Sequence, residues 1–167
     1  MPQGTQVEVL TPGQNEKYYL AGAWDFRTGQ VHHCEGPRKT NQLFRDLLAA
    51  LERRYPAHRY DRISVVVDNY QIHKTQAVQR WLAAHPRFAL LTLPTYCPRA
   101  NPIERIFGDA HDKVTRNHKR KRLRDLVADV CRHIERNGPW PYRLSMIYQE
   151  PNVTAALKEL RHGKCAA

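Results

Sequence analysis

Apolar residues along this chain switch between the spacing of strands and the spacing of helices. Short apolar or alternating runs predict four strands, over residues 17–24, 30–34, 62–67 and 88–93. Apolar positions three and four residues apart predict helices over residues 41–54 and 74–84, from Pro102 onward, and around residues 123–134. The first two strands flank the turn at residues 25–29 and therefore predict a hairpin. This order of strands and helices is typical of an α/β fold.

The pattern predicts one domain with a short tail. The chain has 167 residues, enough for a single hydrophobic core. The sequence Gly-Pro-Trp-Pro at 138–141 ends the last predicted helix, so we expect a domain over residues 1–137 and a tail over residues 138–167. The tail has the pattern of one more short helix around residues 153–160. The continuous apolar run at 62–67 is typical of a strand that is covered on both faces.

Positive charge dominates the composition. Lys and Arg number 27 against 16 Asp and Glu, which gives a net charge of +11. A charge of this size favours a polyanionic partner, and nucleic acid more than a membrane surface. No apolar stretch approaches the roughly 18 residues of a membrane span. No signal peptide opens the chain, so we expect a cytoplasmic protein.

The four cysteines are scattered, without a C-x-x-C pair, and are expected to be reduced thiols. Zinc binding through His32, His33 and Cys34 is conceivable. Adjacent residues of a strand point to opposite faces of the sheet, however, and this disfavours a shared metal.

Two acidic residues stand at places where α/β proteins carry chemistry. Asp68 follows the apolar run 62–67, at the carboxyl end of a strand where ligands of open α/β sheets bind. An Asp-Asn pair after a strand is also typical of a simple turn or a helix cap. Glu104 has a structural alternative as well: Asn101 as N-cap and Pro102 as first helical residue would place Glu104 in a capping box. From these fragments, both interpretations stay open for each acid.

Taken together, the two segments are far more specific. Residues 68–74 (DNYQIHK) and 93–104 (LPTYCPRANPIE) closely resemble the DDE transposases of the bacterial insertion sequence 630 family, which is related to the mariner elements. Members of this family typically carry Asp-Asn-x-x-x-His-Lys and then Leu-Pro-x-Tyr-Ser-Pro-x-Leu-Asn-Pro-Ile-Glu. Cys97 here replaces the usual serine, and Ala100 replaces the usual leucine. Residues 22–29 also resemble the second-strand hairpin of the family, and the likeness extends over roughly residues 3–137.

The resemblance implies a ribonuclease-H-like fold, a mixed sheet flanked by helices, in which three carboxylates bind two Mg²⁺ (or Mn²⁺) ions. Such ions, about 3.5–4 Å apart, stabilise the attacking and leaving oxygens of a phosphodiester displacement. By this match Asp68 is the second catalytic and metal-binding acid, and Glu104 is the third. The first acid of the family lies on a central strand that ends before the segment matched by residues 2–6. We therefore expect the chain to be truncated and to lack this strand and this acid, which would leave a marginally stable or association-prone domain. Asp25 is a poor substitute because it lies in the hairpin turn.

The resemblance also implies DNA transposition. The expected DNA partners are the transposon ends and the target. The chain is also expected to form a homodimer or to associate with a full-length transposase, and to lie in the nucleoid of a bacterium. Lys74 and Arg99 flank the acids and could contact the scissile strand, whereas His73 is expected to be structural. Seven Lys or Arg and no acids lie between residues 113 and 124, and a DNA-binding role is predicted for Lys113, Arg116, Lys119, Arg120, Lys121 and Arg122. The alternative is a catalytically inactive fragment that binds DNA or dimerises with a transposase.

Overall fold

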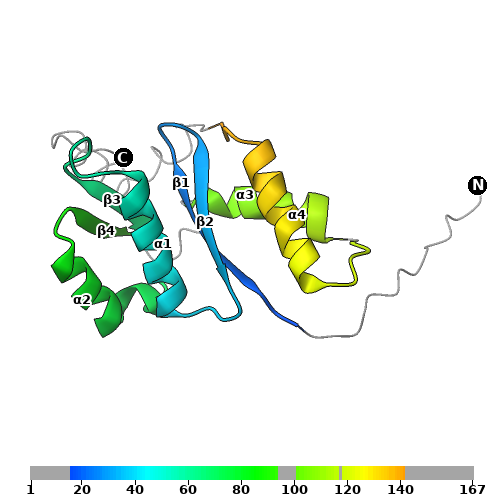
Figure 1. Ribbon diagram of the computed structural model, residues 1–167, viewed down its shortest axis with the longest axis horizontal. Helices are drawn as coiled ribbons and strands as arrows, with labels where there is room; N and C mark the ends of the chain where they lie inside the picture. Colours follow the sequence, from blue (N-terminus) through cyan, green and yellow to red (C-terminus); the bar gives the residue numbers. More distant parts are fainter. Residues whose placement is uncertain (1–15, 94–100, 117, 142–167) are drawn as a thin grey trace, which may run out of the picture.

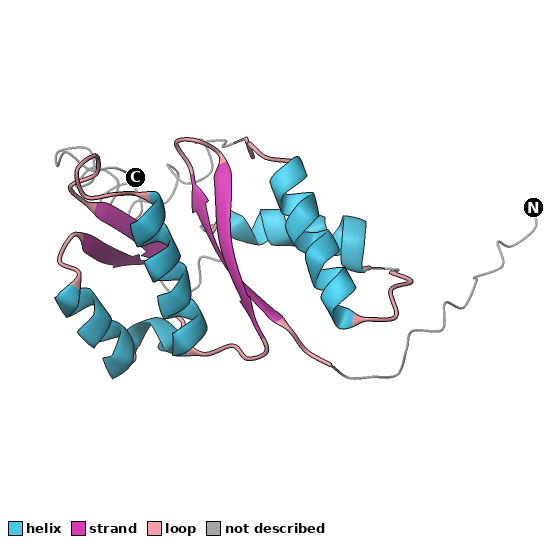
Figure 2. Cartoon of the chain, viewed as in Figure 1, coloured by secondary structure: helices cyan, strands magenta, loops and turns pink. Residues whose placement is uncertain are grey.

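The chain forms two small sheets with helices packed against them (Figure 1, Figure 2). The computed structural model describes residues 16–93, 101–116 and 118–141. In chain order, the elements are β1 (Tyr19–Asp25), β2 (Gln30–Gly36), α1 (Asn41–Arg54), β3 (Ile63–Val67), the 3₁₀ helix η1 (Gln71–Lys74), α2 (Gln76–Ala84), β4 (Phe88–Thr92), α3 (Ile103–Ala110), the π-helical turn η3 (His111–Thr115) and α4 (Leu123–Arg136).

The β1–β2 hairpin separates two groups of helices. Its strands pair antiparallel, with Gly22 opposite His33 and Trp24 opposite Val31. α1 packs against the hairpin from one side, and α3 and α4 pack against it from the other (Figure 1). Because side chains alternate along a strand, neighbouring residues of β1 enter different cores. Ala23 packs into the core that contains α1, whereas Trp24 packs against α3 and α4.

The second sheet is the parallel pair β3–β4, which packs against α1 and α2. Ile63 lies opposite Phe88, and Val67 lies opposite Thr92. The larger core lies here and consists of Phe44, Leu48, Leu51, Tyr55, Ile63, Val67, Val78 and Phe88. Burial of each large aliphatic or aromatic side chain contributes about 1.5–3 kcal/mol. This core therefore fixes the end of β3 from which Asp68 extends.

The α/β class is confirmed, but the described residues do not form the single mixed sheet that was expected. Within these ranges β1 pairs with β2 and β3 pairs with β4, as two separate two-stranded sheets. The chain was expected to lack the family's central strand, and this stays a prediction, because residues 1–15 lie outside the described ranges. The expectation that residues 62–67 are covered on both faces is wrong for the part of the chain seen here. Val66 is 43% exposed, because α1 and α2 cover the face that carries Ile63 and Val67.

Local sequence explains where the helices begin and end. α1 has the predicted limits, since Thr40 accepts a hydrogen bond from the Leu43 N–H at its start and Arg53 and Arg54 lie in its last turn. α2 begins at Gln76, two residues later than predicted, because residues 71–74 form η1 instead. None of the helices in the described ranges combines the length and hydropathy needed to cross a bilayer.

Gly22 allows α3 to approach β1 closely. A Cβ atom at this position would lie 2.6 Å from Cζ of Phe107 and 3.1 Å from Cδ1 of Ile103. Carbon atoms in favourable contact are about 3.5–4.0 Å apart, so a side chain at residue 22 would push α3 away. α3 carries Glu104 in its first turn, and the glycine in β1 therefore helps to place that acid.

Candidate active site

Asp68 lies directly after β3, at the edge where the two parallel strands end. Leu93 follows β4 and donates its N–H to the Val67 carbonyl at 2.8 Å, which joins the two strand ends. The Asp68 side chain is 51% exposed. This location agrees with the sequence analysis, because ligands of α/β sheets bind beyond the carboxyl ends of parallel strands.

The two carboxylate oxygens of Asp68 differ in their contacts. Oδ1 accepts the Tyr70 N–H at 3.2 Å and also lies 3.1 Å from His73 Nε2. The contact with Tyr70 forms an Asx turn, so the turn that was weighed as an alternative is present. Oδ2 accepts no hydrogen bond from a described residue. The turn thus occupies one oxygen and leaves the other accessible.

His73 is packed rather than free. Its side chain is 18% exposed, and its ring meets Phe44 of α1 edge to face, with the ring centroids 4.3 Å apart. Burial lowers the pKa of the His73 imidazole, and this effect exceeds the opposing attraction to Asp68. Next to it, the Lys74 ammonium donates to Oδ1 of Asn69. The expected structural role of His73 fits this packing.

The capping box that was weighed as an alternative for Glu104 is not formed. α3 begins at Ile103, with Pro102 as N-cap in a helical conformation and without a side-chain cap. Glu104 donates its backbone N–H to the Asn101 carbonyl at 3.2 Å, but its carboxylate has no hydrogen bond to any other described residue. The side chain is exposed, and capping does not account for this acid.

The resemblance implies that Asp68 and Glu104 lie close enough to share metal ions, and this stays a prediction. Residues 94–100, which connect β4 to the start of α3, lie outside the described ranges, and Arg99 is among them. No hydrogen bond in the described chain joins Asp68 to Glu104. The described residues also contain no group of three or more His, Cys, Asp or Glu side chains placed to hold a metal ion.

Asp25 has a structural role. It is 7% exposed and accepts hydrogen bonds from the N–H groups of Arg27 and Thr28 and from the Tyr55 hydroxyl. The Tyr55 hydroxyl donates to Asp25 at 2.8 Å, and His32 Nε2 lies 2.9 Å from the Tyr55 hydroxyl oxygen. Asp25 was predicted in the turn and is the last residue of β1, and its contact with Tyr55, 30 residues away, was not predicted. A carboxylate with these donors is a poor candidate metal ligand.

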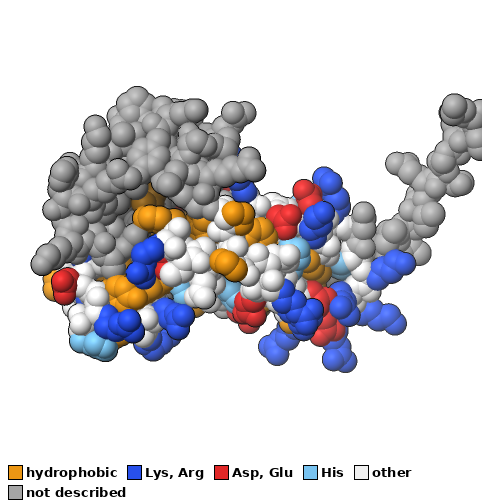
Figure 3. Space-filling model, turned by 90° about the horizontal axis from the view of Figure 1, so that it is seen from above, with side chains coloured by type: hydrophobic (Ala, Val, Ile, Leu, Met, Phe, Trp, Pro, Cys, Tyr) orange, Lys and Arg blue, Asp and Glu red, His pale blue; other side chains and the backbone are white. Residues whose placement is uncertain are grey.

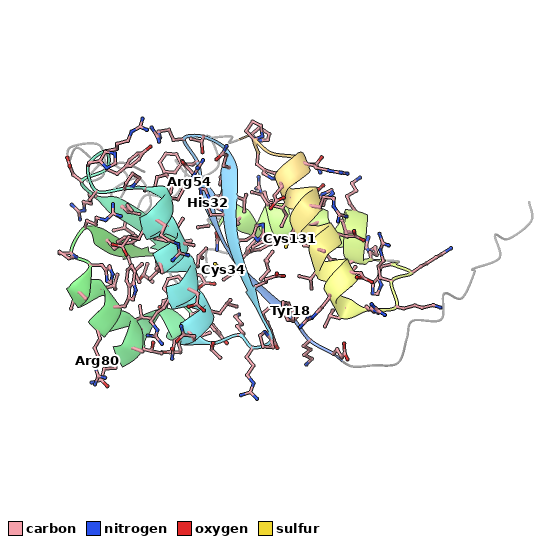
Figure 4. The ribbon with its side chains drawn as sticks, viewed as in Figure 1. Tyr18, His32, Cys34, Arg54, Arg80 and Cys131 are labelled. Atoms are coloured by element: carbon pink, nitrogen blue, oxygen red, sulfur yellow. The ribbon has the colours of Figure 1, made fainter. Side chains whose placement is uncertain are left out.

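The His32, His33 and Cys34 group cannot form one zinc site. His32 contacts Tyr55 at the end of α1, whereas His33 contacts Glu135 on α4. These residues point to opposite faces of β2, as expected from strand alternation. Cys34 and Cys131 are free thiols on different sides of the same strand (Figure 4). Burial raises the pKa of the Cys131 thiol to about 11.

The predicted basic segment runs from η3 into the start of α4 and is exposed. Two of its cations are paired: Arg116 lies 3.4 Å from Asp112, and Arg120 lies 2.6 Å from Asp129. Five others have no acidic partner among the described residues, namely Lys113, Lys119, Lys121, Arg122 and Arg124. Figure 3 shows Lys and Arg side chains crowded at the end of the molecule that carries α3, η3 and α4, with some acids between them.

Comparisons with known proteins agree with the two motifs. A family model described as "DDE superfamily endonuclease" matches residues 1–127. A protein of Shigella sonnei, the "Insertion element IS630 uncharacterized 39 kDa protein", is 42% identical over 139 residues. The matched region covers 83% of this chain and 40% of that relative, so the chain spans less than half of the relative's length.

Proposed function

The chain belongs to the DDE superfamily endonuclease family, and on this basis we propose that it is the catalytic part of a DNA transposase. The reaction is metal-dependent cleavage of DNA at transposon ends and joining of the ends to target DNA. Asp68 and Glu104 are the proposed catalytic acids. The similarity to an insertion element protein supports transposition over other nuclease functions.

The environment of Asp68 carries this proposal. Its carboxylate follows a strand that is anchored in the larger core, it is half exposed, and one of its oxygens accepts no hydrogen bond from the described residues. Glu104, whose carboxylate does not cap α3, would supply the second carboxylate. An Asx turn uses a single carboxylate oxygen, so the turn at Asp68 is compatible with a metal bound through Oδ2.

The donors fit a hard divalent cation. Carboxylate oxygens are the ligands that Mg²⁺ prefers, and Mg²⁺ keeps several waters when few protein ligands are present. Bound Mg²⁺ or Mn²⁺ would supply charge stabilisation and in-line orientation of the phosphodiester oxygens. In this proposal Asp68 and Glu104 hold the metal, and Lys74, kept near Asp68 by Asn69, contacts the DNA backbone. Arg99 has the same proposed role.

The basic segment supplies the wider DNA contact. Lys113, Lys119, Lys121, Arg122 and Arg124 are exposed and have no described acidic partner, so phosphates can replace water around them. Arg116 and Arg120 would first have to leave Asp112 and Asp129, or would share them with a phosphate. Partners of this kind agree with the net charge of +11.

A nicking assay on supercoiled DNA tests the proposal. We expect nicking with Mg²⁺ or Mn²⁺, none with EDTA, and a loss of at least about a hundredfold in Asp68→Ala and in Glu104→Ala. Asp61→Ala is the matched control, because Asp61 is an exposed acid at the opposite end of β3. Nicking that survives both active-site substitutions would reject the assignment of the acids.

A second function follows from a different observation. Within the described ranges no group of three acids or other ligands is placed for metal binding, whereas the Lys and Arg side chains of the basic segment are exposed. The chain could then act without catalysis, as a fragment that binds DNA or associates with a full-length transposase. DNA binding that is insensitive to EDTA and unchanged in the Asp68 and Glu104 variants, without nicking, would favour this function.

A further inference from the structure

We propose that His73 is a positioning residue that fixes the Asp68 carboxylate and directs its Oδ2 atom outward, toward a cation. The inference rests on the proposed function, since it assigns the metal-facing atom of a proposed ligand. It goes further in naming a second residue on which the geometry of that ligand depends.

The first argument is the asymmetry of the carboxylate. Both described donors, the Tyr70 N–H at 3.2 Å and His73 Nε2 at 3.1 Å, meet the same oxygen, Oδ1. A single hydrogen bond to Oδ1 restrains rotation of the carboxylate about its last bond only weakly. A second donor to the same oxygen, from the His73 side chain, restrains this rotation further. With Oδ1 held in this way, Oδ2 is left for another ligand.

The second argument is that the imidazole is itself held firmly. η1 brings residue 73 back toward Asp68, and Phe44 packs on the ring from α1, with the ring planes at 65°. Phe44 belongs to the larger core, so the position of the imidazole is coupled to that core. A positioning residue needs such support, because a mobile donor would not restrict the carboxylate.

The third argument concerns the ring nitrogens. Nδ1 of His73 is buried and has no hydrogen-bond partner among the described residues. Nε2 faces a carboxylate oxygen, which can only accept, so Nε2 carries a hydrogen. A hydrogen on Nδ1 would be buried without an acceptor, which is unfavourable. The geometry thus selects the neutral Nε2–H tautomer, with its hydrogen aimed at Oδ1.

Two substitutions separate positioning from packing. His73→Gln retains an N–H at a similar reach from the backbone, whereas His73→Phe retains an aromatic ring against Phe44 and removes the N–H. If His73 acts only through packing, the phenylalanine variant should behave like the parent chain. If it acts by donating to Asp68, the glutamine variant should.

The test combines a spectroscopic measurement with a binding measurement on the full chain. In ¹⁵N-edited spectra of the unsubstituted protein, we expect His73 to show a protonated Nε2 and an unprotonated Nδ1. With Mn²⁺ as the probe, followed by water-proton relaxation, we expect affinity to fall roughly tenfold in His73→Phe and to stay within about threefold of the parent in His73→Gln. Asp68→Ala should abolish this binding.

The outcomes distinguish the two levels of the proposal. An Nδ1–H tautomer would overturn the inference about His73, and so would unchanged Mn²⁺ affinity in His73→Phe when Asp68→Ala removes binding; either result leaves the proposed function standing. Mn²⁺ binding that persists in Asp68→Ala would reject the proposed metal site itself. If His73→Phe does not fold, the tautomer measured in the parent chain decides.

Discussion

Tyr55 donates its hydroxyl to the buried carboxylate of Asp25 at 2.8 Å and so attaches the end of α1 to the turn of the β1–β2 hairpin. The Tyr55 hydroxyl oxygen accepts a hydrogen bond from His32 Nε2, since its single hydrogen is directed at Asp25. Burial and the hydrogen bond to Asp25 raise the pKa of the Tyr55 hydroxyl well above its ordinary value. The hydroxyl therefore stays protonated, and the chain His32–Tyr55–Asp25 has a fixed direction of donation.

Removal of the Tyr55 hydroxyl should destabilise the fold. Tyr55→Phe leaves the ring in the core but removes a donor from a buried carboxylate, for which we expect a loss of about 1–3 kcal/mol in the free energy of unfolding. Urea denaturation measures this. Tyr60→Phe is the control, because Tyr60 accepts a hydrogen bond from Arg27 at an exposed site and its loss should cost less than about 1 kcal/mol. Equal losses in the free energy of unfolding would show that the buried hydrogen bond to Asp25 stabilises the fold no more than the exposed one.

His32 should make stability fall at acid pH. Its pKa is lowered, first by burial and then by the positive charge of Arg54, while Asp25 acts in the opposite direction (Figure 4). Because the unfolded chain takes up the proton more readily, the stabilising contribution is complete above the unfolded pKa of about 6.5. It is lost as the pH falls through the folded pKa. The urea midpoint should therefore drop between pH 7.5 and pH 5, with a smaller drop in His32→Gln, whose amide can replace the donor to Tyr55 without titrating. A drop of the same size in the variant would assign the effect to other groups.

Substitution of Gly22 should disturb the position of α3. The added methyl group of Gly22→Ala would overlap the Phe107 ring, and we expect a loss of about 1–3 kcal/mol. Phe107→Leu in the same chain should restore part of the loss, because it removes the atom that is 2.6 Å away. Thermal or urea unfolding of both variants checks this.

Gly108→Ala, in α3 itself, should have the opposite effect on stability from Gly22→Ala. Gly108 lies within α3, and an added Cβ would have no atom of another described residue within 4 Å beyond the helix's own backbone. This substitution should stabilise the protein by about 0.5–1 kcal/mol, because it lowers the entropy of the unfolded chain. A destabilised Gly108→Ala would mean that α3 packs differently from the arrangement described above.

DNA affinity should depend steeply on salt. If the five cations of the basic segment without acidic partners each neutralise one phosphate, log K should fall against log salt with a slope of about −4.5. Alanine at Lys119, Lys121 and Arg122 should reduce the slope to about −1.8. Fluorescence anisotropy with a duplex of fixed length measures both values.

The matched control removes the same charge elsewhere. Arg53, Arg59 and Arg80 are exposed on or near α1 and α2, away from the basic segment, and Figure 4 shows Arg80 at the far end of the molecule. Their triple alanine variant has the same net charge as the first. Its salt slope should stay near that of the parent chain, whereas an equal change in both variants would mean that binding follows total charge only.

Local patterns predicted the elements well because each depends on neighbouring residues. α1 was predicted to the residue, since its apolar positions and its Thr40 cap are all local. The hairpin followed from the turn at Asp25–Gly29, where Gly29 has a positive φ of 73°. The start of α2 was wrong by two residues because the η1 turn depends on the packing of Ile72 and His73 on the core.

The candidate site was predicted in part. The position of Asp68 follows from strand order, but its contact with His73 depends on a 3₁₀ turn that the sequence pattern did not indicate. The alternative of a capping box at Glu104 is not realised, because the Glu104 N–H bonds to the backbone carbonyl of Asn101 and no side chain caps α3. Asp25 and Tyr55 meet across 30 residues, and no local signal encodes such a contact.

The hairpin also determines how the protein unfolds. Its strands send alternate side chains into the core with α1 and into the core with α3 and α4, so neither half can open without uncovering a face of the same two strands. The two halves should therefore behave as one foldon. In hydrogen exchange, the paired amides of β1 and β2 should be among the last to exchange, because their release requires both halves to open.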